Sequence, residues 1–246
     1  MQALALRKVR QREVRKMKKL GHYTLVAGLF DYPTQDYPDR VRAIEKGLRE
    51  DYPLVADKII KFLELLPAEN LRTMQELFTR SFDVQAITTL DIGYVLFGDD
   101  YKRGELLSNL NREHVAAKNF CGSELADHLP NVLRLLDRLN DKELIEELVQ
   151  LLIAPSLRKM IGEFSPERIE TKNKAYQKHY KTLLESPVGK KINAVTLYRY
   201  TLEALLDILA ANFVLIEQKE LPQTCDFLKS IKQENEIEEK AESHAN

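Results

Sequence analysis

The sequence lacks several residue types on which particular fold classes depend. Its 246 residues include two cysteines, no tryptophan, nine glycines and nine prolines. Two cysteines cannot build the disulfide framework of a small secreted domain or a four-cysteine zinc site, so we expect a reducing compartment, the cytoplasm. The scarcity of glycine and proline, beside abundant leucine, glutamate, lysine and alanine, favours helix over sheet. The composition therefore excludes an all-β sandwich.

The sequence also lacks an excess of charge of either sign and a long, uninterrupted apolar run. Its 37 basic and 38 acidic side chains nearly cancel, so no net field draws the protein to nucleic acid or to an anionic membrane. The longest apolar stretch, 192–216, contains Arg199, Glu203 and Asp207, which would lie in hydrocarbon if the stretch crossed a bilayer. The basic residues of segment 1–19 are not followed by the apolar stretch of a secretory signal. We predict a soluble protein with no nucleic-acid partner and no stable membrane insertion.

Apolar residues recur at intervals of three and four along most of the chain, which is typical of amphipathic helices. No internal repeat and no Gly/Ser-rich linker divides it. These patterns predict an all-α fold, a single compact helical domain of about eight to ten helices. The domain is expected over residues 1–230, with a frayed basic start at 1–12 and an acidic, disordered tail at 231–246. The expected helices are 9–30, 38–51, 53–66, 70–82, 104–120, 130–161 with a break near 140, 166–186 and 190–219; segment 83–104 is expected to be a long loop with one short helical turn.

Familiar catalytic and cofactor-binding motifs are absent from the sequence. It contains no phosphate-binding loop, no Gly-x-Gly-x-x-Gly turn and no His-Glu-x-x-His pair. His114 and Cys121 fall at the spacing of one helical face, about 10 Å apart along the axis, so both cannot ligate one metal from a straight helix. A buried, hydrogen-bonded histidine and a buried cysteine are the structural interpretation, and an enzyme built on His114, His128 or Cys121 is the alternative. We predict no catalytic residue, no metal and no cofactor.

The densest polar cluster lies in residues 123–130, and two interpretations of it stay open. In the structural one, Asp127 caps the helix that follows, with Pro130 in its first turn. In the functional one, two acidic acceptors and a switchable histidine donor lie beside an apolar wall in a cleft: Glu124, Asp127, His128, Leu129 and Pro130.

This cluster resembles the Glu-x-x-Asp-His element of the redox-enzyme maturation chaperones, the TorD/DmsD/NarJ superfamily. Leucine after the glutamate and Leu-Pro after the motif are similar to the NarJ branch. Segment 76–83 resembles that branch's Glu-Leu-Tyr-x-x-x-Phe-Asp, and segment 94–104 resembles its Leu-Phe followed by Asp and Arg-Gly, in the same order and spacing. The resemblance covers residues 75–135. Ala126 and His128 depart from the branch, which often has proline and tyrosine there, and the histidine is similar to the TorD/DmsD branch.

The resemblance implies a non-catalytic assembly chaperone of the nitrate reductase delta-subunit type. Such proteins bind the N-terminal segment of a molybdoenzyme catalytic subunit, often a twin-arginine signal or its remnant, and hold the apoprotein for molybdenum cofactor insertion before export or membrane docking. The implied partners are that subunit and the cofactor insertion machinery. Carboxylates would receive the client's arginines, and apolar side chains would add contact. The implied client-binding residues are Glu124, Asp127, His128, Leu129, Pro130, Asp83, Tyr94, Leu96, Phe97 and Arg103, the last bracing its loop through Asp99 or Asp100.

A helical adaptor or scaffold protein that is unrelated to molybdoenzymes is the alternative function. Both hypotheses share the expected fold, so they differ only in the partner that the protein binds.

Overall fold

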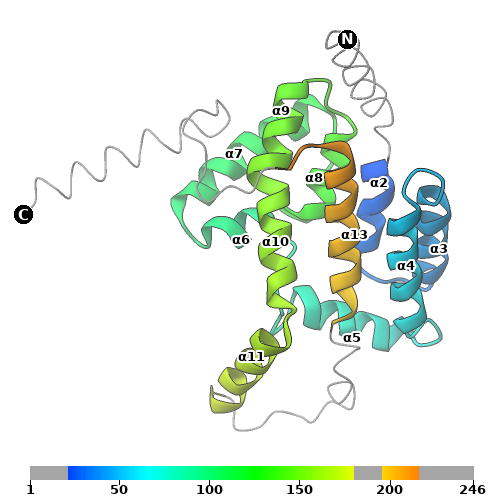
Figure 1. Ribbon diagram of the computed structural model, residues 1–246. Helices are drawn as coiled ribbons and strands as arrows, with labels where there is room; N and C mark the ends of the chain where they lie inside the picture. Colours follow the sequence, from blue (N-terminus) through cyan, green and yellow to red (C-terminus); the bar gives the residue numbers. More distant parts are fainter. Residues whose placement is uncertain (1–21, 180–195, 216–246) are drawn as a thin grey trace, which may run out of the picture.

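The computed structural model describes residues 22–179 and 196–215 (Figure 1). Within these residues the chain is helical and contains no strand, only an isolated antiparallel bridge between Asp91 and His128. The expected all-α fold is confirmed. The basic start, the acidic tail and the outer parts of the helices expected at 9–30, 166–186 and 190–219 lie outside the described residues.

The described elements follow one another with short connections. They are α2 (His22–Ala27), the 3-10 turn η1 (Gly28–Phe30), α3 (Tyr37–Leu48), α4 (Pro53–Leu65), α5 (Leu71–Phe82), α6 (Ile92–Phe97), α7 (Tyr101–Ala116), α8 (Leu129–Leu136), α9 (Lys142–Glu147), the π-helical η2 (Leu148–Ile153), α10 (Ala154–Glu163), α11 (Pro166–His179) and α13 (Leu197–Asn212).

Helix α13 lies at the centre of the bundle. It packs against α4 on one side and α10 on the other, while α2 packs on α8 and α3 on α4. Figure 1 shows α10 and α13 side by side, with α5 crossing near their lower ends. The ring of Tyr198 in α13 lies within 5.6 Å of the rings of Phe62, Phe78 and Phe82. Burial of these aromatic side chains joins the described helices into one hydrophobic cluster.

Several helix boundaries follow from local signals in the sequence. Pro53 occupies the first turn of α4, where a missing N–H costs nothing. The Asn70 side chain accepts a hydrogen bond from the Thr73 N–H at 3.1 Å and caps α5. Both helices have nearly the bounds that the sequence predicts.

The expected helix 104–120 was wrong at both ends. The Asp100 side chain accepts from the Lys102 N–H at 2.9 Å, so α7 begins at Tyr101. The other end comes early because Lys118 has a left-handed backbone, with φ of +52°. His114 therefore lies in α7 and Cys121 beyond it, not on one helical face.

The helix expected over 130–161 is divided near 140, as predicted, and contains a π-helical turn that the sequence analysis did not anticipate. Asp141 caps α9 by accepting from the Glu143 and Leu144 N–H groups. The wide turn η2 then precedes Pro155, whose ring has no N–H and would clash with a carbonyl of the preceding α-helical turn. No helix among the described residues is long and apolar enough to cross a membrane.

Candidate functional site

The antiparallel bridge brings together two chain segments that are far apart in the sequence. The Ile92 N–H donates to the Asp127 carbonyl at 3.0 Å, and the Leu129 N–H donates to the Leu90 carbonyl at 2.8 Å. Asp91 and His128 consequently lie side by side, at the start of α6 and the start of α8.

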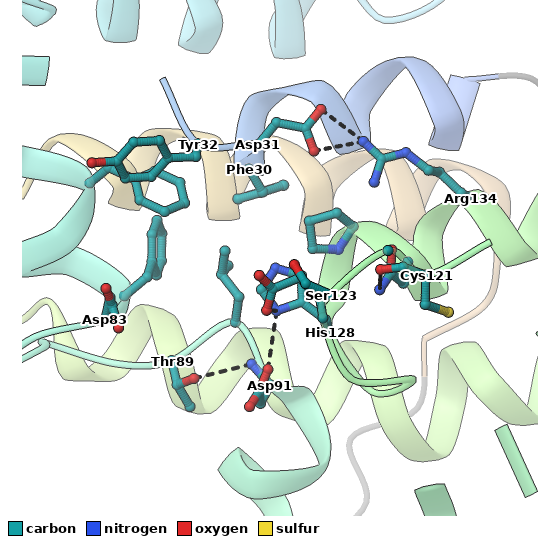
Figure 2. Close-up of a pocket in the computed structure, with 17 residues that line it drawn as sticks. Phe30, Asp31, Tyr32, Asp83, Thr89, Asp91, Cys121, Ser123, His128 and Arg134 are labelled. Carbon is teal, nitrogen blue, oxygen red and sulfur yellow. Dashed lines mark hydrogen bonds and ion pairs between the residues drawn. The ribbon is translucent and has the colours of Figure 1, made fainter. Parts of the chain in front are cut away.

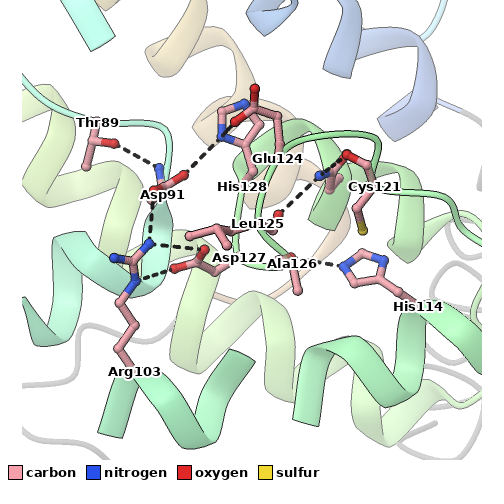
Figure 3. A network of polar contacts seen from close by, with 11 residues as sticks. Thr89, Asp91, Arg103, His114, Cys121, Glu124, Leu125, Ala126, Asp127 and His128 are labelled. Carbon is pink, nitrogen blue, oxygen red and sulfur yellow. Dashed lines mark hydrogen bonds and ion pairs between the residues drawn. The ribbon is translucent and has the colours of Figure 1, made fainter. Parts of the chain in front are cut away.

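An arginine and two carboxylates form a partly buried ion network beside this bridge (Figure 3). Arg103 Nε lies 2.9 Å from Asp127 Oδ2, and one of its terminal nitrogens lies 2.9 Å from Asp91 Oδ2. The Asp127 side chain is 0% exposed and that of Arg103 14%. The guanidinium also lies over the Tyr94 ring, 5.3 Å from its centroid. Arg103 thus satisfies a carboxylate that has no access to water.

Gly93 makes the close approach of Asp127 possible. A Cβ atom at residue 93 would lie 2.6 Å from Asp127 Oδ2 and 2.8 Å from a methyl carbon of Leu106. Any larger residue would displace the buried carboxylate from Arg103.

The loop between α7 and α8 is held by side chains that bind its backbone carbonyls. His114 Nε2 donates to the Ala126 carbonyl at 2.9 Å, and Asn131 Nδ2 donates to those of Cys121 and Leu125, each at 3.1 Å. Asn119 Nδ2 donates to His114 Nδ1 at 2.9 Å and to the Asn131 carbonyl at 3.0 Å. Burial of the His114 ring lowers its pKa, which keeps it neutral and able to accept at Nδ1.

His128 and Glu124 lie on the outer side of this framework. His128 Nδ1 donates to Asp91 Oδ1 at 3.1 Å and lies 3.9 Å from Glu124 Oε2. The hydrogen bond from His128, followed by the charges of His128 and Arg103, lowers the pKa of Asp91 despite its partial burial. Glu124 is 57% exposed and has no closer ion-pair partner among the described residues. It is therefore a carboxylate that a ligand can reach.

These groups border a cavity of about 500 Å³, which we name the acidic pocket (Figure 2). Its aromatic side comes from the end of η1 and from α5, and its polar side from the bridge and the loop before α8. Arg134 is its one arginine and is already held by Asp31, at 2.6 and 2.8 Å. Its lining includes three phenylalanines, four acidic residues and a histidine: Phe30, Phe78, Phe82, Asp31, Asp83, Asp91, Glu124 and His128.

The acidic pocket unites four of the residues that the sequence analysis proposed for client binding. Asp83, Glu124, His128 and Pro130 all line it. Asp83 is exposed and forms no ion pair with another described residue, whereas Pro130 is buried and forms part of the wall.

The structure corrects the predicted roles of Asp127 and Arg103. Asp127 does not cap α8, because His128 is the N-cap residue and no side chain bonds the first turn. Being buried and bound to Arg103, Asp127 cannot receive a ligand's arginine. Arg103 braces the fold through Asp91 and Asp127, not through Asp99 or Asp100.

The remaining apolar candidates lie apart from the acidic pocket. Leu129 is fully buried in the core, and Leu96 and Phe97 are partly buried against it. Tyr94 is 43% exposed and lines a neighbouring cavity. These residues do not form one apolar wall beside Glu124.

Asp91, Asp31 and the aromatic wall were missed by the sequence analysis. Asp91 reaches His128 through a bridge between segments 37 residues apart, and Asp31 pairs with Arg134 across 103 residues. The aspartate before Tyr32-Pro33 was a detectable polar signal, but it indicated only the end of a helix.

The pocket offers little for a catalytic interpretation. Burial raises the pKa of the Cys121 thiol, which makes it a poorer nucleophile, and His114 is committed to structural hydrogen bonds. Within residues 22–179 and 196–215, no three His, Cys, Asp or Glu side chains are grouped so that they could hold a metal ion. What the arrangement can do chemically is to bind cations through exposed carboxylates and apolar groups through its aromatic wall.

Comparison with protein-family models, with curated proteins and with solved structures finds no match for this chain.

Proposed function

We propose that this protein is a cytoplasmic assembly chaperone that binds the N-terminal segment of a molybdoenzyme catalytic subunit and holds the apoprotein for molybdenum cofactor insertion, before export or membrane docking. The acidic pocket is the proposed client site. The protein itself carries out no reaction in this proposal, and its partners are the catalytic subunit and the cofactor insertion machinery.

The observation that carries the proposal is the chemistry of the acidic pocket. Four carboxylates line it: Asp31 is paired with Arg134 and Asp91 with Arg103, whereas Asp83 and Glu124 are exposed and left for a ligand. Phenylalanine side chains from η1 and α5 line the same cavity. A peptide with arginines and bulky apolar residues suits both sides, because carboxylates bind guanidinium groups by charge-assisted hydrogen bonds and aromatic rings bury apolar side chains.

The positions of the three sequence segments that resemble the chaperone family also support the proposal. The first segment ends at Asp83 in the wall of the pocket, the second contributes Arg103, and the third contributes Glu124 and His128. Arg103 joins the second segment to the third through Asp127. The three segments, which are separated in the sequence, thus contribute to one polar region. Its exposed acidic residues are Asp83 and Glu124.

Glu124→Gln is the variant that tests this proposal. Glutamine keeps the shape of the side chain and removes its charge, so binding of the client's N-terminal peptide should weaken by about 1–3 kcal/mol. The client would be isolated by co-purification with the tagged protein from its source cells, and its N-terminal peptide titrated by calorimetry. Glu64→Gln in α4 is the matched control, because Glu64 is exposed and lies outside the pocket.

The two functions under consideration predict different captured proteins. A maturation chaperone enriches a large molybdopterin-binding subunit, and a general adaptor enriches other proteins. Capture without any such subunit, or equal peptide affinity of the Glu124→Gln variant, the Glu64→Gln variant and the unaltered protein, would contradict the proposal.

A further inference from the structure

A second cavity, of about 850 Å³, lies next to the acidic pocket, and we name it the basic pocket. It is bordered by α6, α10, α11 and the segment between α5 and α6. Four of its side chains are basic and two are acidic: Arg158, Lys159, Arg168, Lys172, Asp83 and Glu163. The balance of charge is therefore opposite to that of the acidic pocket.

The positive charge of the basic pocket is only partly neutralised. Glu163 lies 3.0 Å from Lys172 Nζ and 3.8 Å from Arg168 Nε. Lys172 also donates to the Ile87 carbonyl, which fixes α11 against the segment between α5 and α6. Arg168 is 66% exposed, and Lys159 is exposed on α10. These two cations are accessible to an anionic ligand.

The two pockets are adjacent. Phe82, Asp83 and Thr89 line both of them, so a chain that leaves the acidic pocket across these residues enters the basic one. Tyr94 and Val95 add apolar surface beside the cations. The exposed cations come from two successive helices, an arrangement that fits an extended chain with several carboxylates better than a single phosphoryl group.

We infer that the basic pocket receives an acidic stretch of the same client polypeptide whose basic stretch occupies the acidic pocket. This inference rests on the proposed function. The client segment then contains a basic stretch and a neighbouring acidic stretch, each bound by the pocket of opposite charge. The order of the two stretches in the client sequence determines the direction in which the segment crosses Phe82, Asp83 and Thr89.

Three synthetic peptides test the inference on the full-length protein. The first is basic and contains leucine and arginine, and the other two carry a run of glutamates joined to its C-terminal or its N-terminal end. One extended peptide should bind at least about tenfold more tightly than the first, because the second contact forms within an existing complex. The gain should shrink in high salt, since exposed charges are screened.

Two variants test whether the increase in affinity of the extended peptide depends on the basic pocket. Lys159→Gln combined with Arg168→Gln should abolish this increase and leave the affinity for the basic peptide unchanged. Lys174→Gln is the matched control, because Lys174 is 72% exposed on the same helix as Arg168 but does not line the pocket. Thermal melts verify that each variant is folded.

The outcomes separate this inference from the proposed function. If the basic peptide does not bind, the proposed function fails. If it binds and neither extension tightens binding, or if the Lys159→Gln/Arg168→Gln variant keeps the gain, the inference fails alone. If neither extension tightens binding while pyrophosphate binds the unaltered protein but not the Lys159→Gln/Arg168→Gln variant, the pocket takes a phosphorylated ligand and the inference is overturned.

Discussion

Asp127 and Glu124 are three residues apart and carry the same charge, yet the fold gives them opposite surroundings. Asp127 is 0% exposed and bound to Arg103, whereas Glu124 is 57% exposed on the rim of the acidic pocket. The inner carboxylate contributes to the shape of the loop, and the outer one is free to meet a ligand. Acidic residues in one short motif can therefore differ in whether they support the fold or remain exposed to a ligand.

The two histidines nearby repeat this contrast. His114 is buried and uses both ring nitrogens in hydrogen bonds to Ala126 and Asn119. His128 lines the acidic pocket and bonds Asp91 through one nitrogen. Substitutions of the buried residues Asp127 and His114 should thus alter the free energy of unfolding. Substitutions of the pocket residues Glu124 and His128 should alter the affinity for a ligand.

Replacing Arg103 should have the largest effect on stability. Arg103→Met leaves the buried Asp127 carboxylate without its counter-ion, so the free energy of unfolding should fall by about 3–5 kcal/mol. Urea unfolding measures the loss. Arg103→Lys keeps the positive charge but lacks the planar guanidinium that contacts Asp91 and Asp127 together, so its free energy of unfolding should fall by less. A loss below about 1 kcal/mol for Arg103→Met would show that Asp127 finds another partner or becomes hydrated.

Gly93→Ala should destabilise the protein by a smaller amount, about 1–3 kcal/mol, because the added methyl group overlaps Asp127 Oδ2 and Leu106. This reverses the usual sign, since alanine normally stabilises a helix relative to glycine by roughly 0.5–1 kcal/mol. Gly104→Ala in α7 is the matched control, because nothing lies within 4 Å of its added Cβ. Chemical denaturation of both variants should show shifts of opposite sign, and parallel shifts would contradict the close packing at residue 93.

The smallest expected effect is a pH dependence that comes from His114. Its pKa in the folded protein lies below the ordinary value of 6.5, chiefly because of burial, so the unfolded chain takes up the proton at a higher pH. The associated stability is fully present above pH 6.5 and is lost as the pH falls from 6.5 towards the lowered pKa. A protonated Nδ1 would also face the Asn119 amide donor.

The measurement compares unfolding free energies of the protein and the His114→Gln variant across this pH range. The free energy of unfolding of the variant should decline less steeply below pH 6.5, although the variant is less stable at neutral pH. Identical slopes would show that His114 titrates alike in the folded and unfolded chains.

Local signals were sufficient to predict much of the helical framework. Pro53 and the cap residue Asn70 marked the starts of α4 and α5, and the apolar spacing gave the buried faces. The end of α7 could not be predicted in this way, because a lysine, not a glycine, adopts the left-handed conformation there. The π-helical turn before Pro155 was likewise not predicted, although the proline itself was visible.

The sequence predicted several residues of the candidate site, but it did not predict which of them are buried and which are exposed. Glu124, His128 and Asp83 do meet at one pocket. The burial of Asp127 depends on Arg103 and Gly93 arriving from elsewhere in the chain, so the motif alone could not distinguish it from Glu124. Asp91 was missed for the same reason, since its contact with His128 is made by long-range pairing.

The way in which His114 and Asn131 hold the loop before α8 has a consequence for protein engineering. Both side chains bind main-chain carbonyls, those of Cys121, Leu125 and Ala126, so the loop's path does not depend on which side chains it carries between them. Ser123 and Glu124 can be varied in a library while the backbone keeps its course. The loop is in this respect a framework into which new ligand preferences can be introduced without redesigning the bundle beneath it.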